Sequence, residues 1–572
     1  QAMKITVAKT AGFCMGVRRA VDMVLDAANT TTGPIYTYGP LIHNPQVLEM
    51  LEEKKIRQLD HIPDKGEGTV LIRAHGVPPE DQTTLEHAGF RIINATCPRV
   101  IKVQSIIRKH AEKGYGVIIV GDKNHPEVIG LLGYAGEKGH TVSQPEELEQ
   151  IPLFENAVIV AQTTQDTSFF KEIKERVKTL YPHYKIFDTI CDSTEKRQAE
   201  IREIAQTHDA IVVVGGKNSG NTKRLSEIAR STGKPCAHIE DPEELDPSIF
   251  SEAENVAVTA GASTPNWIIT RTCREIEKKV SEKGAVSKRG AAVRDFLLHT
   301  NIMLAAGAGC MTYAGARLMN LEHSFYHSQI AVFYVLSMQI LNNLLTIAPD
   351  TYNNPDRAAL YRKNFALFAA LAILSGAAGL YLAFLKGKAC FSVLLVMSLL
   401  GLSYNLPLLP GPAGGKQIRR IKDLPGSKTI LIAVAWGIVT SILPAVSNRT
   451  AFGPAICSFV FITGLVFART ALFDVIGIQG DRINGKETLP ILIGEKQSIK
   501  LIKQILFLIA LLIIGSSIFG ITNPKGTLFA TLPVLMIYFT RRIERHTIGA
   551  GSNLSILMEC HFIVAGGLAL MV

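Results

Sequence analysis

The chain has 572 residues, of which 19% are charged, and its mean hydropathy is +0.20. This length excludes a single small module, because domains average ~150 residues, and the hydropathy is unusual for a wholly water-soluble protein. The charge is uneven: residues 290–572 hold 23 Lys and Arg against 11 Asp and Glu, a net of +12, which leaves residues 1–289 with a net of −2. Nine cysteines without a Cys-x-x-Cys pair argue against a zinc ribbon or a disulfide framework, so we expect a reducing compartment.

Residues 3–280 alternate short apolar runs with segments of helical period. Each run is followed by a polar loop and then by the helical pattern, which predicts βαβ units and parallel sheets. The predicted strands lie within 4–8, 69–74, 90–96, 115–121, 156–162, 185–190, 210–216 and 255–261.

A strand that ends at a cysteine and continues into a helix occurs three times in this half. The cysteines are Cys14, Cys97 and Cys191, which are 83 and 94 residues apart. Parallel sheets bind ligands at the carboxyl ends of their strands, and a helix N-terminus lowers a thiol pKa. Three thiolates with a fourth position left for substrate suit either zinc or an iron–sulfur cluster in a catalytic site. The remaining cysteines do not lie between a predicted strand and a predicted helix in this way, so we expect them only to pack against other apolar side chains.

Polar side chains with phosphate-binding chemistry occupy the other loops that follow predicted strands. Imidazoles, hydroxyls, an amide and Gly-rich backbone amides suit a phosphate or diphosphate that no metal neutralises. The predicted binding residues are His43, His75, His125, Thr163, Ser219, Asn221 and Ser263. Glu127, two positions after His125, is the predicted proton donor, because burial raises the pKa of a carboxyl group. No Gly-x-Gly-x-x-Gly follows the first strand, which argues against a Rossmann dinucleotide site.

From about residue 296 the sequence becomes a series of apolar runs separated by short polar loops. Most runs are near the ~20 residues that cross a bilayer, and they lack the polar stripe of a soluble helix. The runs are 296–318, 328–347, 365–385, 389–409, 429–447, 451–473, 501–521, 526–540 and 553–572. They predict an all-α bundle of about nine transmembrane helices over residues 295–572, joined by a linker at 281–294 to the α/β domain at 3–280.

Basic residues are concentrated in every second predicted loop of the membrane half. They follow the second, fourth, sixth and eighth predicted spans, within 357–363, 416–428, 469–503 and 541–545. Because basic loops stay on the cytoplasmic side, the N-terminal half is expected there too. The sequence therefore predicts a multi-pass protein of the cell inner membrane with a cytoplasmic N-terminal domain.

Residues 3–280 resemble the IspH/LytB family, the 4-hydroxy-3-methylbut-2-enyl diphosphate reductases. The shared motifs are GFCMGVRRA, GPLIHNP, RAHGVPP, NATCPRV, HPEV, AQTTQD, TICDST, KNSGNT and TAGAS. The resemblance implies a trefoil of three α/β units around a 4Fe–4S cluster bound by Cys14, Cys97 and Cys191. It further implies that the predicted His, Ser, Thr and Asn residues hold the diphosphate and that Glu127 delivers protons. Two electrons from ferredoxin or flavodoxin would convert hydroxymethylbutenyl diphosphate to isopentenyl and dimethylallyl diphosphates.

Residues 295–572 resemble the UbiA superfamily of intramembrane prenyltransferases, most clearly in QIRRIKDLPGSKT and FDVIGIQGDRINGKETLPILIGEK. The resemblance implies two acidic motifs that hold a prenyl diphosphate through Mg²⁺, with the prenyl chain among the helices. Both motifs depart from the family pattern at positions that normally carry Asp or Asn, namely Asn343, Thr346, Phe473 and Gly477. The carboxylates that remain are Asp350, Asp474 and Asp481. A spacing of seven predicts that Asp474 and Asp481 share one helical face.

The sequence as a whole predicts a bifunctional isoprenoid protein. A reductase would be fused to a prenyltransferase that uses a prenyl diphosphate, a lipophilic acceptor and the membrane lipid around it; no nucleic-acid partner is expected. Two alternatives remain open at this point. The membrane half can be a non-catalytic anchor or prenyl-lipid binding module, and the first half can be a zinc enzyme or a hydratase-type cluster enzyme.

Overall fold

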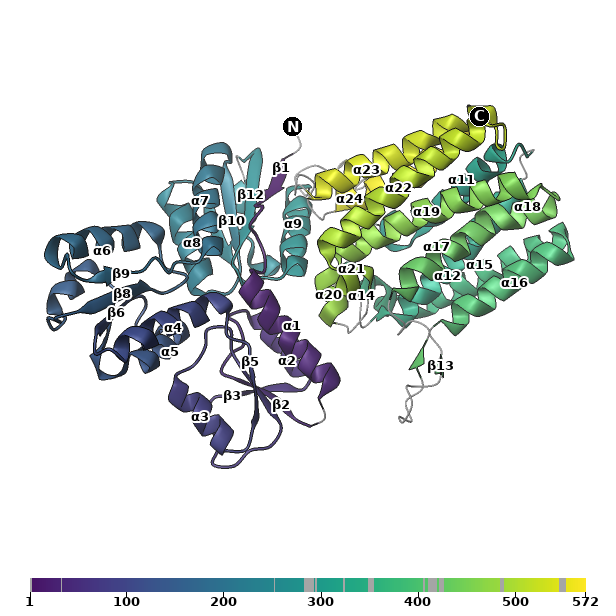
Figure 1. Cartoon of the computed structure of the whole chain (residues 1–572). Helices are drawn as coiled ribbons and strands as arrows, with labels where there is room; N and C mark the ends of the chain where they lie inside the picture. The colour runs from purple at the N-terminus through teal and green to yellow at the C-terminus, as the bar shows by residue number, and fades with distance from the viewer. Residues whose placement is uncertain are drawn as a thin grey trace. The chain divides into compact units, whose positions relative to one another are not determined.

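The computed structural model divides into two compact units, Gln1–Val280 and Ser281–Val572 (Figure 1). It describes residues 3–31, 33–250, 253–281, 293, 296–321, 325–347, 354–404, 407–409, 419–420, 426–483, 488–544 and 552–572. Among these described residues, the first unit is α/β and the second is helical apart from one short strand pair.

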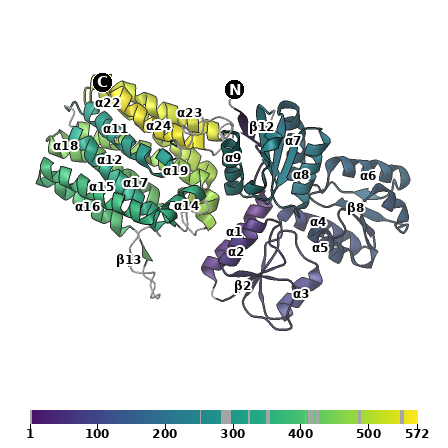
Figure 2. The same cartoon turned by 180° about the vertical axis from the view of Figure 1, so that it is seen from behind.

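Three four-stranded parallel sheets form the first unit, in the orders β3-β2-β4-β5, β7-β6-β8-β9 and β11-β10-β12-β1. Figures 1 and 2 show them in three separate lobes of this unit. The strands are β1 (Lys4–Val7), β2 (Ile35–Tyr38), β3 (Ile56–Leu59), β4 (Thr69–Ile72), β5 (Arg91–Asn94), β6 (Gly116–Val120), β7 (Gly139–Val142), β8 (Ala157–Ala161), β9 (Lys185–Ile186), β10 (Ala210–Val214), β11 (Cys236–Ile239) and β12 (Asn255–Ala260). The first strand of the chain completes the third sheet, so β1, β5 and β9 are equivalent edge strands.

In the second sheet, helices cover both faces of the inner strands β6 and β8, which explains why these two strands are apolar throughout. In the second sheet, Ile119 and Val158 pack under α4 and α5, whereas Ile118 and Ile159 pack under α6. The helices are α1 (Met15–Thr30), α2 (Pro45–Glu53), α3 (Pro79–His87), α4 (Pro98–Ala111), α5 (Pro126–Ala135), α6 (Thr167–Leu180), α7 (Asp192–Thr207), α8 (Gly220–Ser231) and α9 (Asn266–Ser281). Four of them begin with proline, whose fixed φ favours the first helical position.

The prediction of an α/β fold with parallel sheets is confirmed, and all eight predicted runs contain a strand. Four strands were not predicted. Three of these, β3 (IRQL), β7 (GHTV) and β11 (CAHI), lie at sheet edges, where one neighbour is missing and the sequence needs fewer apolar residues. The fourth, β2 (IYTY), is flanked by Gly and Pro and is too short to show a period.

The second unit is a bundle in which α11 and α12, α12 and α15, α19 and α22, and α11 and α24 pack side by side. Its elements are α11 (Ile302–Leu318), α12 (Phe325–Leu345), α14 (Pro355–Lys363), α15 (Phe365–Lys386), α16 (Lys388–Ser403), α17 (Ser427–Gly437), the π-helical turn η6 (Ile438–Ile442), α18 (Leu443–Ser447), α19 (Phe452–Ile476), α20 (Ile478–Ile483), α21 (Leu489–Ile493), α22 (Glu495–Ile518), the 3-10 helix η7 (Pro524–Ala530), α23 (Thr531–Glu544) and α24 (Ser552–Ala569). Strands β13 (Pro407–Leu409) and β14 (Arg419–Arg420) pair antiparallel.

Five helical segments among the described residues are long and apolar enough to cross a membrane. They are Phe325–Leu345, Phe365–Lys386, Ser427–Ser447, Phe452–Ile476 and Glu495–Ile518. The other four predicted spans contain the shorter elements α11, α16, α23 and α24, so the number nine stays a prediction. On α15, Leu367, Ile373 and Leu374 are each about two-thirds exposed, as expected for a face that contacts lipid.

One predicted span ends earlier than its apolar run. The run 389–409 is helical only to Ser403, and Pro407 begins strand β13. Proline has no amide hydrogen and disfavours helical φ and ψ in the residue before it. Hydropathy alone therefore placed the end of this helix too far along the chain.

Candidate functional site

Cys14, Cys97 and Cys191 occupy the same position in the three lobes. Each follows one of the equivalent edge strands, and each is the N-cap residue of the next helix, α1, α4 or α7. The backbone N–H of each cysteine donates to the loop after the neighbouring strand: Cys97 to Ala74 O at 2.9 Å, Cys191 to Thr163 O at 2.9 Å and Cys14 to Ala262 O at 3.1 Å. Those loops carry His75, Thr163 and Ser263, so the thiols adjoin the residues predicted to bind phosphate.

The three thiols also lie close to one another. A Cβ atom added at Gly16, in the first turn of α1, would lie only 2.4 Å from Cys97 Sγ, so the approach of these segments requires glycine. Cys14 and Cys191 are near enough for their charges to act on the Cys97 thiol. All three cysteines are free and partly buried. The geometry thus brings together three sulfur ligands from three helix N-termini.

The expectation of a lowered thiol pKa at a helix N-terminus is wrong for Cys97. Burial raises the pKa of the Cys97 thiol and outweighs the backbone hydrogen bonds from Arg99 and Val100, which lower it. The charges of Cys14 and Cys191 raise the Cys97 pKa further. Crowded thiolates repel one another, so this sulfur is best ionised when a bound cation neutralises the group.

Arg197 was not predicted from the sequence. It also indicates that the three thiols bind a metal group. Its side chain is buried, and its guanidinium donates to Gly12 O at 2.7 Å and to Ala260 O at 3.0 Å. The thiolate charges of Cys14 and Cys191 act on this guanidinium, although burial lowers the pKa of Arg197. Three convergent free sulfurs beside a buried cation fit an anionic metal cluster held by three thiolates.

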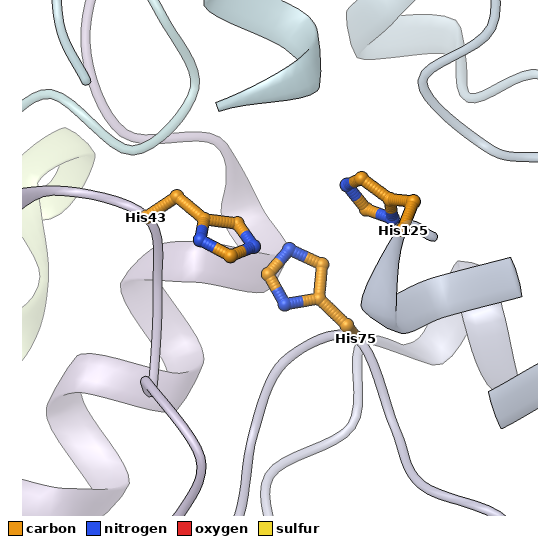
Figure 3. A group of neighbouring side chains, drawn as sticks. All are labelled: His43, His75 and His125. Atoms are coloured by element: carbon orange, nitrogen blue, oxygen red, sulfur yellow. The ribbon is translucent and has the colours of Figure 1, made fainter. Parts of the chain in front are cut away.

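His43, His75 and His125 form a compact imidazole cluster (Figure 3). They come from the loops after β2, β4 and β6, and their ring centroids are 4.8 to 5.9 Å apart. Burial, together with neighbouring positive charge, lowers the pKa of all three, that of His125 to about 4. His125 Nδ1 accepts from the Glu127 N–H at 3.1 Å, so neutral His125 carries its proton on Nε2. The cluster is uncharged near neutral pH and can offer N–H donors to an anion.

Glu127, in the first turn of α5, is the buried carboxyl group of this site, with only 1% of its surface exposed. The Thr163 N–H donates to Oε1 at 2.6 Å, and the Thr163 hydroxyl donates to Oε2 at 2.8 Å. These bonds favour the carboxylate, but burial outweighs them and raises the pKa of Glu127 to about 7. Glu127 can therefore hold or release a proton at neutral pH.

The remaining predicted residues surround the same loops. Ser219 caps α8, Asn221 lies in its first turn, and the Ser263 hydroxyl donates to His43 O at 3.0 Å. Several polar atoms among the described residues of this region are buried without a hydrogen-bond partner, namely His43 Nε2, Asn44 Nδ2, Gln46 Oε1, His75 Nδ1, Asn221 Nδ2 and Thr222 Oγ1. Buried polar groups normally have partners, so a polar ligand is expected here.

A repeat that the sequence reasoning missed relates these residues. Asn44, His125 and Ser219 are the N-cap residues of α2, α5 and α8, which follow the equivalent strands β2, β6 and β10. Two positions later stand Gln46, Glu127 and Asn221. The similarity of HNPQV at 43–47 to NHPEV at 124–128 was the signal that would have added Asn44 and Gln46 to the predicted site.

Arg224 links two lobes beside the imidazole cluster. It too was not predicted from the sequence. Its Nη2 contacts both Asp122 carboxylate oxygens at 3.1 and 3.0 Å, and its Nε donates to Gln165 Oε1 at 3.0 Å. Arg224 belongs to α8, whereas Asp122 and Gln165 belong to loops of the second lobe. A cleft of about 470 Å³ is lined by these three residues together with Gly220, Phe169 and Lys223.

The acidic residues of the second unit are not arranged as the sequence predicts. Asp350 lies outside the described residues. Helix α19 ends at Ile476, Gly477 follows it, and Asp481 lies in α20, so Asp474 and Asp481 are not on one continuous helix. Asp474 is 2% exposed, and both of its oxygens have partners: Lys428 Nζ at 2.9 Å from Oδ1 and the Thr429 hydroxyl at 2.6 Å from Oδ2. Asp474 is therefore held by two residues of α17.

A second, largely buried ion pair joins α19 to α24. Arg469 of α19 donates to Glu559 of α24, and the Arg469 guanidinium stacks on Phe473, 4.8 Å from the ring centroid. Ionisable groups inside a membrane bundle are costly, and they usually serve a function.

Comparisons with known proteins agree with the two halves seen in the structure. Residues 5–277 match the LytB protein family and residues 302–555 match the UbiA prenyltransferase family. The 4-hydroxy-3-methylbut-2-enyl diphosphate reductase of Aquifex aeolicus is 41% identical over 282 residues, which cover 48% of this chain and 96% of that protein.

Solved structures show likeness to both halves. The reductase of Plasmodium falciparum has 27% identity and a TM-score of 0.46, with 48% of this chain and 88% of that chain covered. An apo UbiA homolog from Aeropyrum pernix K1 has 16% identity and a TM-score of 0.37, with 47% and 99% covered. The chain therefore belongs to the LytB family through residues 5–277, and its residues 302–555 match the model of the UbiA prenyltransferase family.

Proposed function

We propose that the first unit is a 4-hydroxy-3-methylbut-2-enyl diphosphate reductase that holds a 4Fe–4S cluster through Cys14, Cys97 and Cys191. The observation that carries this proposal is the pairing of each cysteine amide with a loop that bears His75, Thr163 or Ser263. Three sulfurs and a polar pocket are thereby fixed to one another by backbone hydrogen bonds. When bound, the cluster would pass two electrons, one at a time, from the external donor to the substrate, which loses its hydroxyl group as water.

The diphosphate is held by neutral donors. The imidazoles of His43, His75 and His125 remain uncharged because burial lowers their pKa values, and each can donate one N–H. Ser219 and Asn221 stand at the N-terminus of α8, whose backbone amides add positive potential. Thr163 and Ser263 complete the proposed set from the loops after β8 and β12. The orphaned atoms His43 Nε2 and Asn221 Nδ2 would gain partners on binding.

Glu127 is the proposed proton donor. Reduction consumes two electrons and two protons and releases water, and the products are isopentenyl and dimethylallyl diphosphates. Glu127 has a pKa of about 7, so it can give a proton to the reacting groups and be reprotonated from solvent. Thr163 fixes both carboxyl oxygens and thereby sets the direction in which the proton is presented. Ferredoxin or flavodoxin is the proposed electron donor.

Substrate reduction by the anaerobically purified full-length protein tests this proposal. The assay uses hydroxymethylbutenyl diphosphate with a chemical reductant, and the products are identified by mass spectrometry. Iron and sulfide content are measured on the same sample. Zinc in place of iron would favour the zinc alternative, and bound iron without conversion of this substrate would favour a hydratase-type enzyme.

The second unit is proposed to bind a prenyl diphosphate and to transfer its prenyl group to a lipophilic acceptor. This proposal is supported by the buried Asp474 with its partly exposed partner Lys428 and by the Arg469–Glu559 pair, because a simple anchor does not need them. The unit is proposed to span the cell inner membrane with its basic loops and the first unit in the cytoplasm. Incubation with labelled prenyl diphosphate and membrane lipid extract tests transfer. The anchor alternative predicts no labelled lipid.

A further inference from the structure

We propose that Asn44 is a further diphosphate-binding residue of the first unit, which donates a hydrogen bond from its Nδ2 atom to a phosphate oxygen of the substrate. This inference rests on the proposed reductase function and deepens it, because it adds a ligand contact to the pocket around the imidazole cluster. It follows from the side-chain nitrogen of Asn44, which has a defined orientation and no structural task.

The Asn44 side chain stabilises the fold with only one of its two polar atoms. Asn44 is the N-cap residue of α2, and its Oδ1 accepts from the Val47 N–H at 3.0 Å. That bond fixes the orientation of the amide group and leaves Nδ2 unused. Asn44 is 1% exposed, and no acceptor among the described residues lies within hydrogen-bond distance of Nδ2. Helix capping does not explain the amide nitrogen, because serine or aspartate caps a helix equally well.

The repeat places Asn44 beside residues already proposed to bind the diphosphate. Asn44, His125 and Ser219 are the N-cap residues of α2, α5 and α8. The rings of His43 and His125 lie 5.9 Å apart in the imidazole cluster (Figure 3). A Cβ atom added at Gly216 would lie 2.6 Å from His43 O, so the loop before α8 touches the residue before Asn44. The N-terminus of α2 therefore adjoins the same pocket as those of α5 and α8.

The charges around Asn44 favour an anionic ligand. Burial and the positive charge of Arg73 lower the pKa of the adjacent His43. The backbone amides at the N-terminus of α2 add positive potential. Gln46 holds this turn against the third lobe, because its Nε2 donates to Glu240 O at 2.8 Å, and the Glu240 side chain itself accepts from a backbone N–H at 2.6 Å. A buried N–H donor in these surroundings suits a phosphate oxygen.

Replacing Asn44 with aspartate separates ligand binding from helix capping. The new carboxylate can still accept from the Val47 N–H, and aspartate is as good an N-cap residue as asparagine. It cannot donate, however, and its charge repels a phosphate. The Kd for hydroxymethylbutenyl diphosphate is measured by calorimetry on anaerobically purified full-length protein without reductant. We expect it to rise by roughly tenfold or more, the loss of one hydrogen bond to a charged group, with iron content and melting temperature undiminished.

The same titration with inorganic diphosphate locates the contact. This ligand lacks the hydroxymethylbutenyl group, so Asn44→Asp should weaken its binding by a similar factor. When reductant is added, KM for the substrate should rise by that factor, and kcat should change less. A loss confined to the whole substrate would overturn the inference, because Asn44 would then contact the organic part.

Two further variants act as controls. Gln144→Glu adds a negative charge at the exposed N-cap residue of the 3-10 helix η2 (Pro145–Gln150) in the second lobe, and it should leave both Kd values unchanged. Asn44→Ser keeps a cap oxygen without adding charge, but serine is too short to place a donor where Nδ2 lies. It should weaken binding of both ligands, by less than aspartate does.

The possible results separate the inference from the proposed function. Unchanged Kd values in both Asn44 variants would overturn the inference, and conversion of the substrate would still establish the reductase. A loss in Asn44→Asp alone would also overturn it, because the added charge would then be the cause. Weaker binding by both variants, in a protein whose unaltered form does not convert the substrate, would overturn the reductase function and keep the Asn44 contact. An unaltered protein that binds neither ligand would overturn both.

Discussion

Replacing Glu127 with glutamine changes one property of the candidate site, its capacity to release a proton. Glutamine has the shape of glutamate, and its amide can still accept from the Thr163 N–H and donate to the Thr163 hydroxyl oxygen. The three cysteines and their hydrogen bonds are untouched, so the variant should bind a full complement of iron. Turnover should nevertheless fall by ~10²-fold or more, because the acid is missing.

The pH profile follows from the direction of the Glu127 shift. Burial raises the Glu127 pKa from its ordinary value of 4.5 to about 7, so the protonated form prevails below pH 7 and is lost as the pH rises through that value. With one titrating acid, the protonated fraction falls from roughly 90% at pH 6 to roughly 1% at pH 9, a drop of about 100-fold. The imidazoles should not add a limb in this range, because their pKa values are lowered and that of His125 is about 4.

The assay measures kcat/KM for hydroxymethylbutenyl diphosphate between pH 5.5 and 9 under anaerobic conditions, with iron content determined at each pH. The unaltered protein should show one descending limb centred near pH 7, and Glu127→Gln should show a low and flat profile. A flat profile for the unaltered protein, or unchanged turnover in the variant, would refute Glu127 as the proton donor.

Three other predictions concern the first unit. Serine substitution of any cluster ligand should abolish both the iron content and the turnover, whereas Cys236→Ser should preserve both; the ligands to be changed are Cys14, Cys97 and Cys191. Gly16→Ala should reduce the iron bound per chain, since the new Cβ would lie 2.4 Å from the Cys97 sulfur, whereas Gly515→Ala, which has open space around it, should not. Arg224→Gln should raise KM by about tenfold with less effect on kcat, because the link between α8 and the second lobe is lost; an unchanged KM would remove Arg224 from the substrate site.

Much of the first unit could be predicted because its signals are local. Runs such as AIVVVGG are continuous apolar strands, and a cysteine placed between a strand and a helix is visible in the sequence three times. The edge strands β3, β7 and β11 were not predicted, because a strand with one neighbour buries few side chains and needs little apolar sequence. Helix ends set by proline, such as that before Pro407, require attention to single residues rather than to average hydropathy.

The residues missed at the sites share a different property. Arg197, Arg224 and Lys428 act through partners that are 46 to 185 residues away in the chain. Nothing near them in sequence distinguishes them from solvated surface cations. Their roles arise only when the fold brings a carbonyl, a carboxylate or a thiol to them, which local patterns do not encode.

Product analysis with the full-length protein tests whether the first unit is a 4Fe–4S reductase. The protein is purified anaerobically, its iron and sulfide are quantified, and it is incubated with hydroxymethylbutenyl diphosphate and a reductant. We predict about four irons and four sulfides per chain and conversion to isopentenyl and dimethylallyl diphosphates. A protein that holds this cluster and leaves the substrate unchanged, or one that holds zinc instead, would contradict it.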